Sequence, residues 1–281
     1  MFKYQSFSQY SLANLLNDQI FMNHYDAFND PFECWCEVMT DFPPLSDKST
    51  RLSNILSAWG FSEIDETVEK YYDDYVSSLS DTGFDPQKLA DAAKITCFSK
   101  RADNLLMWSH YADGLRGFCI EFDPKSILGT NEKFASIYDV TYQSKPAVID
   151  TALESVYSDQ ADYYASVADV TSDDKDVQFY DDLLHENIEK CQEIYMKMLA
   201  TKPLEWSYEE EQRVIYVSSG GDDSLLSYPS SSIKRIIFGE KMPKSHIQTI
   251  ENLLSAKGLN PEIAFAKRSS RDFKVQITPR I

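Results

Sequence analysis

The chain has 281 residues, 43% of them hydrophobic, which is enough for one large domain or two small ones with a packed core. Its formal net charge of −18 predicts repulsion of a nucleic-acid backbone, so general nucleic-acid binding is not expected. No apolar run reaches the length of a membrane span, and the residues after Met1 lack a signal-peptide pattern, so no membrane partner is expected. Five cysteines without a C-x-x-C pair favour reduced thiols and a cytoplasmic location.

Turn residues and hydrophobic periodicity predict short strands and helices along the first third of the chain. Pro31 fixes its own φ and moves Asp30 out of helical geometry, so residues 29–33 are interpreted as a turn. Gly60 is expected to separate two helices. The expected elements are a strand at 2–4, a helix at 8–16, a strand at 19–22, two helices within 46–80 and a short helix that begins at 85–87.

In the rest of the chain, strands come in blocks separated by helices, which favours an α+β fold over a regularly alternating parallel sheet. We expect a mixed, mostly antiparallel sheet in a single domain, 1–281, with a helical insertion at 147–200. Asp103 is the expected N-cap of one helix. The expected strands are 94–99, 115–122, 134–142, 211–217, 233–238, 262–267 and 273–277, and the expected helices are 103–111, two within 147–200 with the second from about 179, and 243–256.

The segment from Glu209 to Val217 begins with charge and continues as an apolar strand. Because strand side chains alternate between faces, an extended segment would put Glu209, Glu211 and Arg213 on one face at the rim of a core. Such groups are costly to bury unless they are paired or used in a site. One interpretation is a site carboxylate that binds a ribose hydroxyl or stabilises a developing cation. The other is a structural ion pair between Arg213 and one glutamate.

The polar turn at 29–33 also allows two interpretations. The side chains of Asn29 and Asp30 can fix a loop through hydrogen bonds to its own backbone. Alternatively, Asn29 lies in a binding loop, and Asp30 or Glu33 is a site carboxylate at the mouth of a pocket.

Asn104, Trp108 and Tyr111 are expected on one helix face because their spacing is i, i+4, i+7. Two aromatic rings beside an amide suit a flat ligand such as nicotinamide or a base, although the same pattern is typical of a core. His110 lies on a neighbouring face, where packing and catalysis are both open interpretations.

Polar residues near strand ends complete the candidate set, because pockets often open there. They are Lys3, Tyr4 and Ser99. The sequence has no G-x-G-x-x-G, P-loop, G-x-S-x-G or H-E-x-x-H motif. Its four scattered histidines do not favour a multi-histidine metal site, and no metal is expected.

Several of these segments, in this order, resemble a bacterial family known as domain of unknown function 2971. Its members are often found near bacterial defence genes, so the resemblance implies a role in anti-phage defence or as a toxin effector. The acidic helices at 147–190 resemble an insertion into the family pattern. The matching pieces are Lys3-Tyr4, Asn14-Leu15-Leu16, Gln19-Ile-Phe-Met22, Phe28-Asn-Asp-Pro-Phe-Glu33, Ile95-Thr-Cys-Phe-Ser99, Met107-Trp-Ser-His-Tyr111, Gly117-Phe-Cys-Ile-Glu-Phe122, Lys202, Trp206-Ser-Tyr-Glu-Glu-Glu-Gln-Arg213 and Ile236-Ile-Phe-Gly239.

The order of polar positions is also similar to that of ADP-ribosyltransferases. Those enzymes carry a histidine or arginine on a first strand, an aromatic residue or serine on a middle strand and a glutamate, often in E-x-E, at the head of a late strand. The resemblance implies that NAD is the substrate and that Glu211 stabilises an oxocarbenium-like transition state, supported by Glu209, Arg213 and Tyr4. It also implies that Trp108 or Tyr111 stacks on nicotinamide. Lys3 departs from this pattern because a lysine stands where those enzymes have a histidine or arginine. Its ammonium is a single point donor, unlike the forked guanidinium of arginine.

Two other classes of function remain open on the sequence. A metal-dependent nuclease or phosphodiesterase would use Asp30, Glu33, Glu209 and Glu211, because clustered carboxylates suit magnesium. A non-catalytic sensor or partner-binding protein would use the acidic helices at 147–190 as a docking surface for a basic protein.

Overall fold

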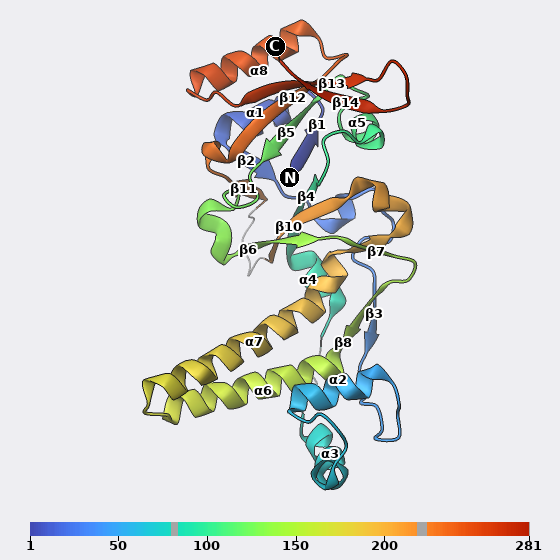
Figure 1. Cartoon of the computed structure of the whole chain (residues 1–281), viewed down its shortest axis with the longest axis vertical. Helices are drawn as coiled ribbons and strands as arrows, with labels where there is room; N and C mark the ends of the chain where they lie inside the picture. Colours follow the sequence, from blue (N-terminus) through green and yellow to red (C-terminus); the bar gives the residue numbers. More distant parts are fainter. Residues whose placement is uncertain (80–83, 218–223, 281) are drawn as a thin grey trace. The chain divides into compact units, whose positions relative to one another are not determined.

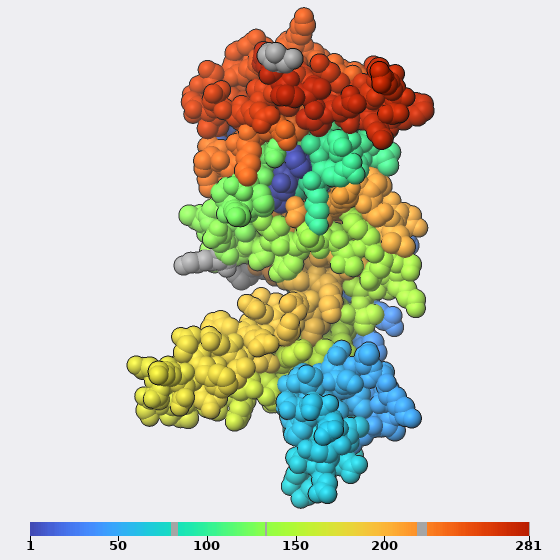
Figure 2. Space-filling model, viewed as in Figure 1, coloured from blue at the N-terminus to red at the C-terminus, as the bar shows by residue number. Residues whose placement is uncertain are grey.

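A computed structural model of the protein describes residues 1–79, 84–217 and 224–280. These residues form two compact units. The first comprises 1–34, 87–144 and the chain from Ala200 onward, and the second comprises 35–86 and 145–199. The expected division, a single domain with one insertion at 147–200, therefore did not anticipate that 35–86 packs with the inserted helices. Figure 1 shows the elements of each unit, and Figure 2 shows the same view in space-filling form with the same colours along the sequence.

The first unit is built on one eight-stranded sheet, in the order β14-β13-β12-β5-β1-β4-β10-β6. Only β12 and β13 run parallel within this sheet, so the expected α+β fold with a mostly antiparallel sheet is confirmed. The strands are β1 (Phe2–Gln5), β4 (Ala93–Ser99), β5 (Phe118–Phe122), β6 (Ala135–Asp139), β10 (Glu211–Val217), β12 (Ile233–Gly239), β13 (Glu262–Arg268) and β14 (Val275–Pro279).

The two faces of this sheet bury different side chains, as the period of two requires. Phe118, Ile120 and Phe122 of β5 belong to one apolar cluster, which also holds residues of α1 (Gln9–Asn17) and α8 (Lys244–Ala256). Cys119, between them in sequence, belongs to a cluster on the other face, beside Trp108 of α5 (Leu105–Tyr111). The aliphatic and aromatic run that predicted β5 is therefore buried on both sides.

Three strands from distant parts of the sequence meet at the centre of the sheet. Phe2 of β1 lies opposite Ser99 of β4, and Ser99 lies opposite Glu211 of β10. β1 and β4 pair at this single position, whereas β10 and β4 pair over seven residues. Past the position at which Phe2, Ser99 and Glu211 lie side by side, the Lys3 ammonium binds the Cys97 carbonyl oxygen at 2.9 Å. The sheet is thus open between β1 and β4, next to Glu211.

Several smaller elements complete the first unit. They are the antiparallel pair β2 (Gln19–Phe21) and β11 (Leu225–Ser227), the parallel pair β7 (Thr141–Gln143) and β9 (Thr201–Pro203), helix α4 (Pro86–Ala92) at the start of the second segment, and the 3-10 turns η1 (Tyr25–Ala27), η2 (Gly129–Lys133), η3 (Leu204–Glu209) and η4 (Ser230–Ser232). Residues of η1, β9 and η3 line a pocket at this opening.

The second unit is mainly helical. Its helices are α2 (Thr50–Trp59), α3 (Glu66–Ser78), α6 (Thr151–Val170) and α7 (Asp174–Leu199), and its two parallel strands are β3 (Cys36–Met39) and β8 (Ala147–Asp150). Apolar residues of α2, α3 and α6 form one cluster, including Ile55, Val68 and Val156. Gly60 ends α2 with φ 100°, as the sequence predicted.

Several sequence predictions differ from these elements in detail. Asn104, and not Asp103, caps α5, because its side chain accepts hydrogen bonds from two backbone N–H groups of the first turn. The strand expected from 115 begins at Phe118, since Leu115 has a positive φ of 70°. Residues 147–150 form a strand, the second acidic helix starts at Asp174, and residue 80 of the helix expected within 46–80 lies outside the described residues.

None of the helices in the described ranges combines the length and apolar character needed to cross a membrane.

A close backbone approach at Gly117 makes that glycine essential to the sheet. A β-carbon there would lie 2.1 Å from the carbonyl oxygen of Gln5 in β1. We expect Gly117→Ala to lower the free energy of unfolding by about 3 kcal/mol or more, because β1 and β5 would have to separate. Urea denaturation measures this change.

Gly258→Ala is the matched control. Its φ is +69° but nothing lies within 4 Å of the added β-carbon. Only backbone strain of about 1–2 kcal/mol is expected there. Equal losses for the two variants would contradict the proposed contact at Gly117.

Candidate functional site

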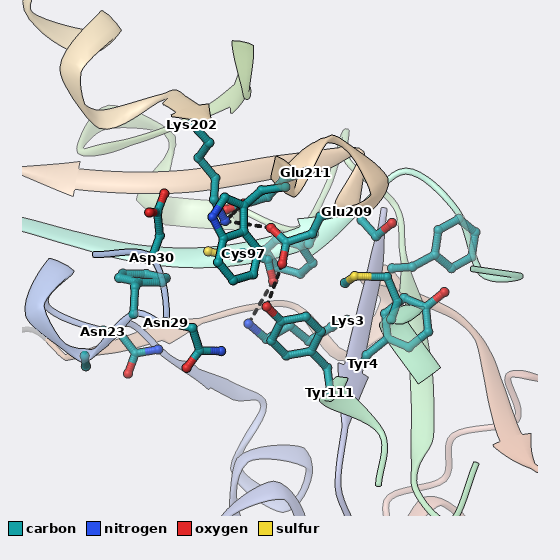
Figure 3. A pocket seen from close by; sticks show the side chains of 17 residues that line it. Lys3, Tyr4, Asn23, Asn29, Asp30, Cys97, Tyr111, Lys202, Glu209 and Glu211 are labelled. Atoms are coloured by element: carbon teal, nitrogen blue, oxygen red, sulfur yellow. Dashed lines mark hydrogen bonds and ion pairs between the residues drawn. The ribbon is translucent and has the colours of Figure 1, made fainter. Parts of the chain in front are cut away.

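A pocket of about 190 Å³ occupies the open part of the sheet in the first unit. It is lined by side chains from five regions of the chain: β1, the loop before Pro31, the end of β4, α5, and the segment from β9 to the start of β10 (Figure 3). Phe2, Phe28, Tyr111 and Trp206 give it aromatic walls. The pocket therefore combines flat apolar surfaces with the charged groups at the head of β10.

Two glutamates and one lysine form a charged cluster on one side of the pocket. Lys202 Nζ donates to Glu209 Oε2 at 2.6 Å and to Glu211 Oε2 at 3.0 Å. The Tyr111 hydroxyl donates to Glu209 Oε1 at 2.6 Å. The side chains of the three charged residues are at most 5% exposed. Buried ions of this kind need paired partners, and Lys202 supplies one to both carboxylates.

Arg213 extends this arrangement behind the pocket. Its Nε donates to Glu211 Oε1 at 2.8 Å, and its two terminal nitrogens donate to the carboxylate of Glu33 at 2.6 and 3.0 Å. The guanidinium is fully buried, and a fork of this kind binds a carboxylate in a fixed plane. Three carboxylates and two cations therefore alternate, which leaves one net negative charge. We call Glu33, Arg213, Glu211, Lys202 and Glu209 the buried charge chain.

The two glutamates of the pocket differ in acidity. Burial acts to raise the pKa of Glu211, but the charges of Arg213 and Lys202 outweigh burial and lower that pKa to about 2. For Glu209, burial is the larger effect and raises the pKa above its ordinary value in spite of Lys202. Glu211 is thus held as a carboxylate, and Glu209 is the better proton acceptor near neutral pH.

The first strand contributes a cation from the opposite side. Lys3 Nζ donates to Thr96 Oγ1 at 2.7 Å and to the Cys97 carbonyl, and burial lowers the pKa of Lys3. Ser99 is fully buried, and its Oγ accepts the Arg101 N–H at 3.2 Å. Burial holds the pKa of the Cys97 thiol well above its ordinary value, so this pocket cysteine is protonated at neutral pH.

The loop before Pro31 contributes amides and a carboxylate. Asn29 and Asp30 line the pocket together with Asn23, which a backbone bridge to Ile95 fixes beside β4. Asp30 Oδ1 accepts the Phe32 N–H at 2.9 Å, as expected for a self-pinned turn. Its Oδ2 is buried and has no hydrogen-bond partner within the described residues. A buried carboxylate oxygen without a donor is costly, so Asp30 is a candidate to accept a hydrogen bond from a ligand.

The structure brings most of the sequence-predicted site residues together. Those that line the pocket are Lys3, Tyr4, Asn29, Asp30, Ser99, Tyr111, Glu209 and Glu211. Glu33 and Arg213 are absent from its lining and form the buried pair described above.

Two aromatic candidates lie elsewhere. Trp108 is fully buried, donates its indole N–H to the Ala102 carbonyl at 2.7 Å and packs edge-on against Tyr4. It is a core residue, because the face of α5 that carries it turns towards the sheet. His110 is exposed and its ring lies 6.3 Å from that of Tyr208. Neither residue lines the pocket, so the expected stacking of Trp108 on a ligand is corrected.

The expected common strand face of Glu209 and Glu211 is also corrected. Glu209 ends the 3-10 turn η3, Glu210 follows with a positive φ of 43°, and β10 begins at Glu211. The two carboxylates converge through their shared lysine and not through strand alternation.

Lys202 and Trp206 are among the pocket residues that sequence reasoning missed as site residues. Lys202 Nζ lies 4.8 Å from the centre of the Trp206 ring, so the indole covers the ammonium. Lys202 was part of the family pattern, but its pairing had no local signal. A cluster of three acidic residues at 209–211 before a buried strand was the available hint that a cation must come from elsewhere.

Within the described ranges, no group of three or more histidine, cysteine, aspartate or glutamate residues is arranged to hold a metal ion. The carboxylates considered for a metal are bound differently: Glu33 to Arg213, and Glu209 and Glu211 to Lys202.

Removing Lys202 should destabilise the fold, because the carboxylates of Glu209 and Glu211 would stay buried without their shared cation. We expect Lys202→Met to lower the free energy of unfolding by about 3–5 kcal/mol, because one cation serves two buried anions. Lys100→Met is the control: Lys100 binds Asp139 at 2.7 Å, but the side chains are 43% and 62% exposed. That loss should stay below about 1 kcal/mol. Similar urea midpoints for both variants would contradict the arrangement.

Glu211 should also make stability depend on pH. A carboxyl group whose pKa is lower in the folded state stabilises the fold above its unfolded pKa, and that contribution is lost as pH falls towards the folded pKa. Glu211→Gln should therefore be less stable than wild type at neutral pH, and the gap should narrow by about 3 kcal/mol between about pH 5 and pH 2. Urea denaturation at a series of pH values measures the gap, and a constant gap would count against the low pKa.

Comparison with known proteins gives one match. Residues 107–214 match a family described as "Protein of unknown function (DUF2971)". Neither a curated protein nor a solved structure matches the chain. The matched region runs from α5 into β10 and includes Tyr111, Lys202, Glu209 and Glu211. It supports the family resemblance found in the sequence over the part of the chain that carries the charged side of the pocket.

Proposed function

We propose that the pocket binds NAD and cleaves the bond between nicotinamide and its ribose, as an ADP-ribosyltransferase or an NAD glycohydrolase does. One observation carries the proposal. Ser99 and Glu211, which match polar strand positions of the ADP-ribosyltransferase pattern, and Lys3, which replaces its histidine or arginine, belong to adjacent strands and line one cavity.

The charge of the site supports this chemistry. Cleavage of the bond leaves positive charge on the ribose, and a fixed carboxylate in a partly dry site stabilises such charge strongly. Glu211 is 3% exposed, ionised and held on both oxygens by Arg213 and Lys202. The buried charge chain retains one net negative charge, so its two cations do not cancel the attraction. Preorganised pairing also avoids the reorientation that water would need.

The walls of the pocket support a ring and a ribose as ligands. Tyr111, Trp206 and Phe28 offer flat faces to a nicotinamide ring, the role first expected for Trp108. Asn23 and Asn29 can bind a carboxamide, and the unpartnered oxygen of Asp30 can accept a hydrogen bond from a hydroxyl or amide donor. A role in anti-phage defence or as a toxin stays a prediction from the family resemblance.

Nicotinamide release from NAD tests the proposal. We expect the purified protein to release nicotinamide, and Glu211→Gln to lower kcat by about 100–1,000-fold while NAD binding is retained. Chromatography measures release, and the NAD-dependent rise in melting temperature measures binding.

Glu210→Gln is the matched control for this experiment. Glu210 is the adjacent residue in sequence, lies outside the pocket lining and pairs with the exposed Arg101. Its loss should leave turnover near the wild-type value. Full turnover in a folded Glu211→Gln protein would rule out the proposed role of Glu211.

A further inference from the structure

The two carboxylates at the reacting end of the pocket are almost inaccessible to solvent. The side chains of Glu209 and Glu211 are 4% and 3% exposed. Tyr111 and Lys202 each donate to Glu209 at 2.6 Å, so this carboxylate is held from two sides. An acceptor that attacks the ribose beside Glu209 must therefore reach a carboxylate that is almost fully buried.

The size of the cavity limits what can enter with NAD. Pockets that enclose drug-sized ligands have volumes of about 300–1,000 Å³. The cavity here has about 190 Å³, which suits the nicotinamide–ribose end of the dinucleotide and leaves the rest of NAD across the opening. A protein side chain or a nucleic-acid base would need that same opening to reach the ribose.

Building on the proposed function, we propose that the acceptor at this site is water, so that the site hydrolyses NAD and does not modify a macromolecule. The bond between ribose C1′ and the nicotinamide nitrogen breaks, and its electron pair stays on that nitrogen, which gives neutral nicotinamide. A water oxygen bonds to C1′, and the water gives up one proton. The products are nicotinamide, ADP-ribose and that proton.

Glu209 is the group that takes the proton. Each of its oxygens accepts one hydrogen bond, from Tyr111 or from Lys202, and a carboxylate oxygen has a second lone pair. The Lys202 ammonium bonded to Glu209 also binds Glu211, so the base lies next to the carboxylate that stabilises the ribose cation. Burial raises the pKa of Glu209 towards the range in which a general base works well.

The decisive experiment follows the fate of the ADP-ribosyl group. The full-length protein is incubated with NAD that carries ³²P in its adenylate phosphate, together with bacterial lysate protein and added DNA and RNA. Chromatography quantifies nicotinamide and free ADP-ribose, and acid precipitation captures label on macromolecules. We expect nicotinamide and free ADP-ribose in equal molar amounts, with no precipitable label above that in Glu211→Gln reactions.

The experiment distinguishes failure of water as the acceptor from failure of the proposed function. Nicotinamide release with label transferred to protein or nucleic acid, and a matching deficit of free ADP-ribose, would overturn water as the acceptor and leave the proposed function standing. No nicotinamide release would overturn the proposed function itself.

Small alcohols test how much room an acceptor has beside Glu209, because they compete with water for the ribose cation. Methanol should give methyl ADP-ribose, whereas benzyl alcohol should be captured at least about tenfold less per mole, since each added carbon must fit between the bound ribose and the buried carboxylates. Trp206→Ala, which removes an aromatic wall over Lys202, should raise the share of the benzyl product. Equal capture of the two alcohols by the wild-type protein would overturn the inference.

Discussion

A single ammonium group determines the geometry of the pocket. Lys202 comes from β9, Glu209 from the end of η3 and Glu211 from the head of β10, and the lysine binds both carboxylates within 3.0 Å. Two carboxylates in a space that excludes water would repel each other, and one would hold a proton. The shared cation offsets that repulsion, so Glu211 stays ionised. It also holds β9, η3 and the start of β10 together.

Arg213 connects this point to a loop that is distant in sequence. Its fork binds Glu33 while its Nε binds Glu211, so the turn that contains Asp30 and Pro31 is fastened to β10. Glu33 therefore acts on the pocket by position, without lining it. The Arg213–Glu33 ion pair also holds Asn29 and Asp30 of this turn at the wall of the pocket. The buried ion pair and the polar turn therefore belong to one arrangement. One network thus positions both the charged and the amide-bearing sides of the pocket.

Local patterns predicted the sheet well because strand alternation and turn chemistry are local properties. The β10 strand was expected at 211–217, and Glu211 at its head was expected to be a site carboxylate or the ion-pair partner of Arg213. Glu211 lines the pocket and also pairs with Arg213. The partner of Glu211 had no such signal, since Lys202 approaches through tertiary structure across η3. Helical spacing grouped Trp108 with Tyr111, but it does not tell which flank of a short helix meets the sheet. Trp108 therefore went to the core and Tyr111 to the pocket.

Three departures from ordinary stability rules gather at this one place. A chain of buried charges is often less stabilising than apolar residues of the same volume. The Asp30 Oδ2 atom is buried without a donor among the described residues, and Glu210 has a positive φ of 43°. Each feature costs free energy, and each involves a residue that lines the pocket or follows one in sequence. Within the described ranges, a positive φ also occurs at Leu115 and a buried polar atom without a partner at Ser232 Oγ, so the buried charge chain is the feature that distinguishes this place. A preorganised anionic site accounts for that chain, since stability alone would favour apolar residues.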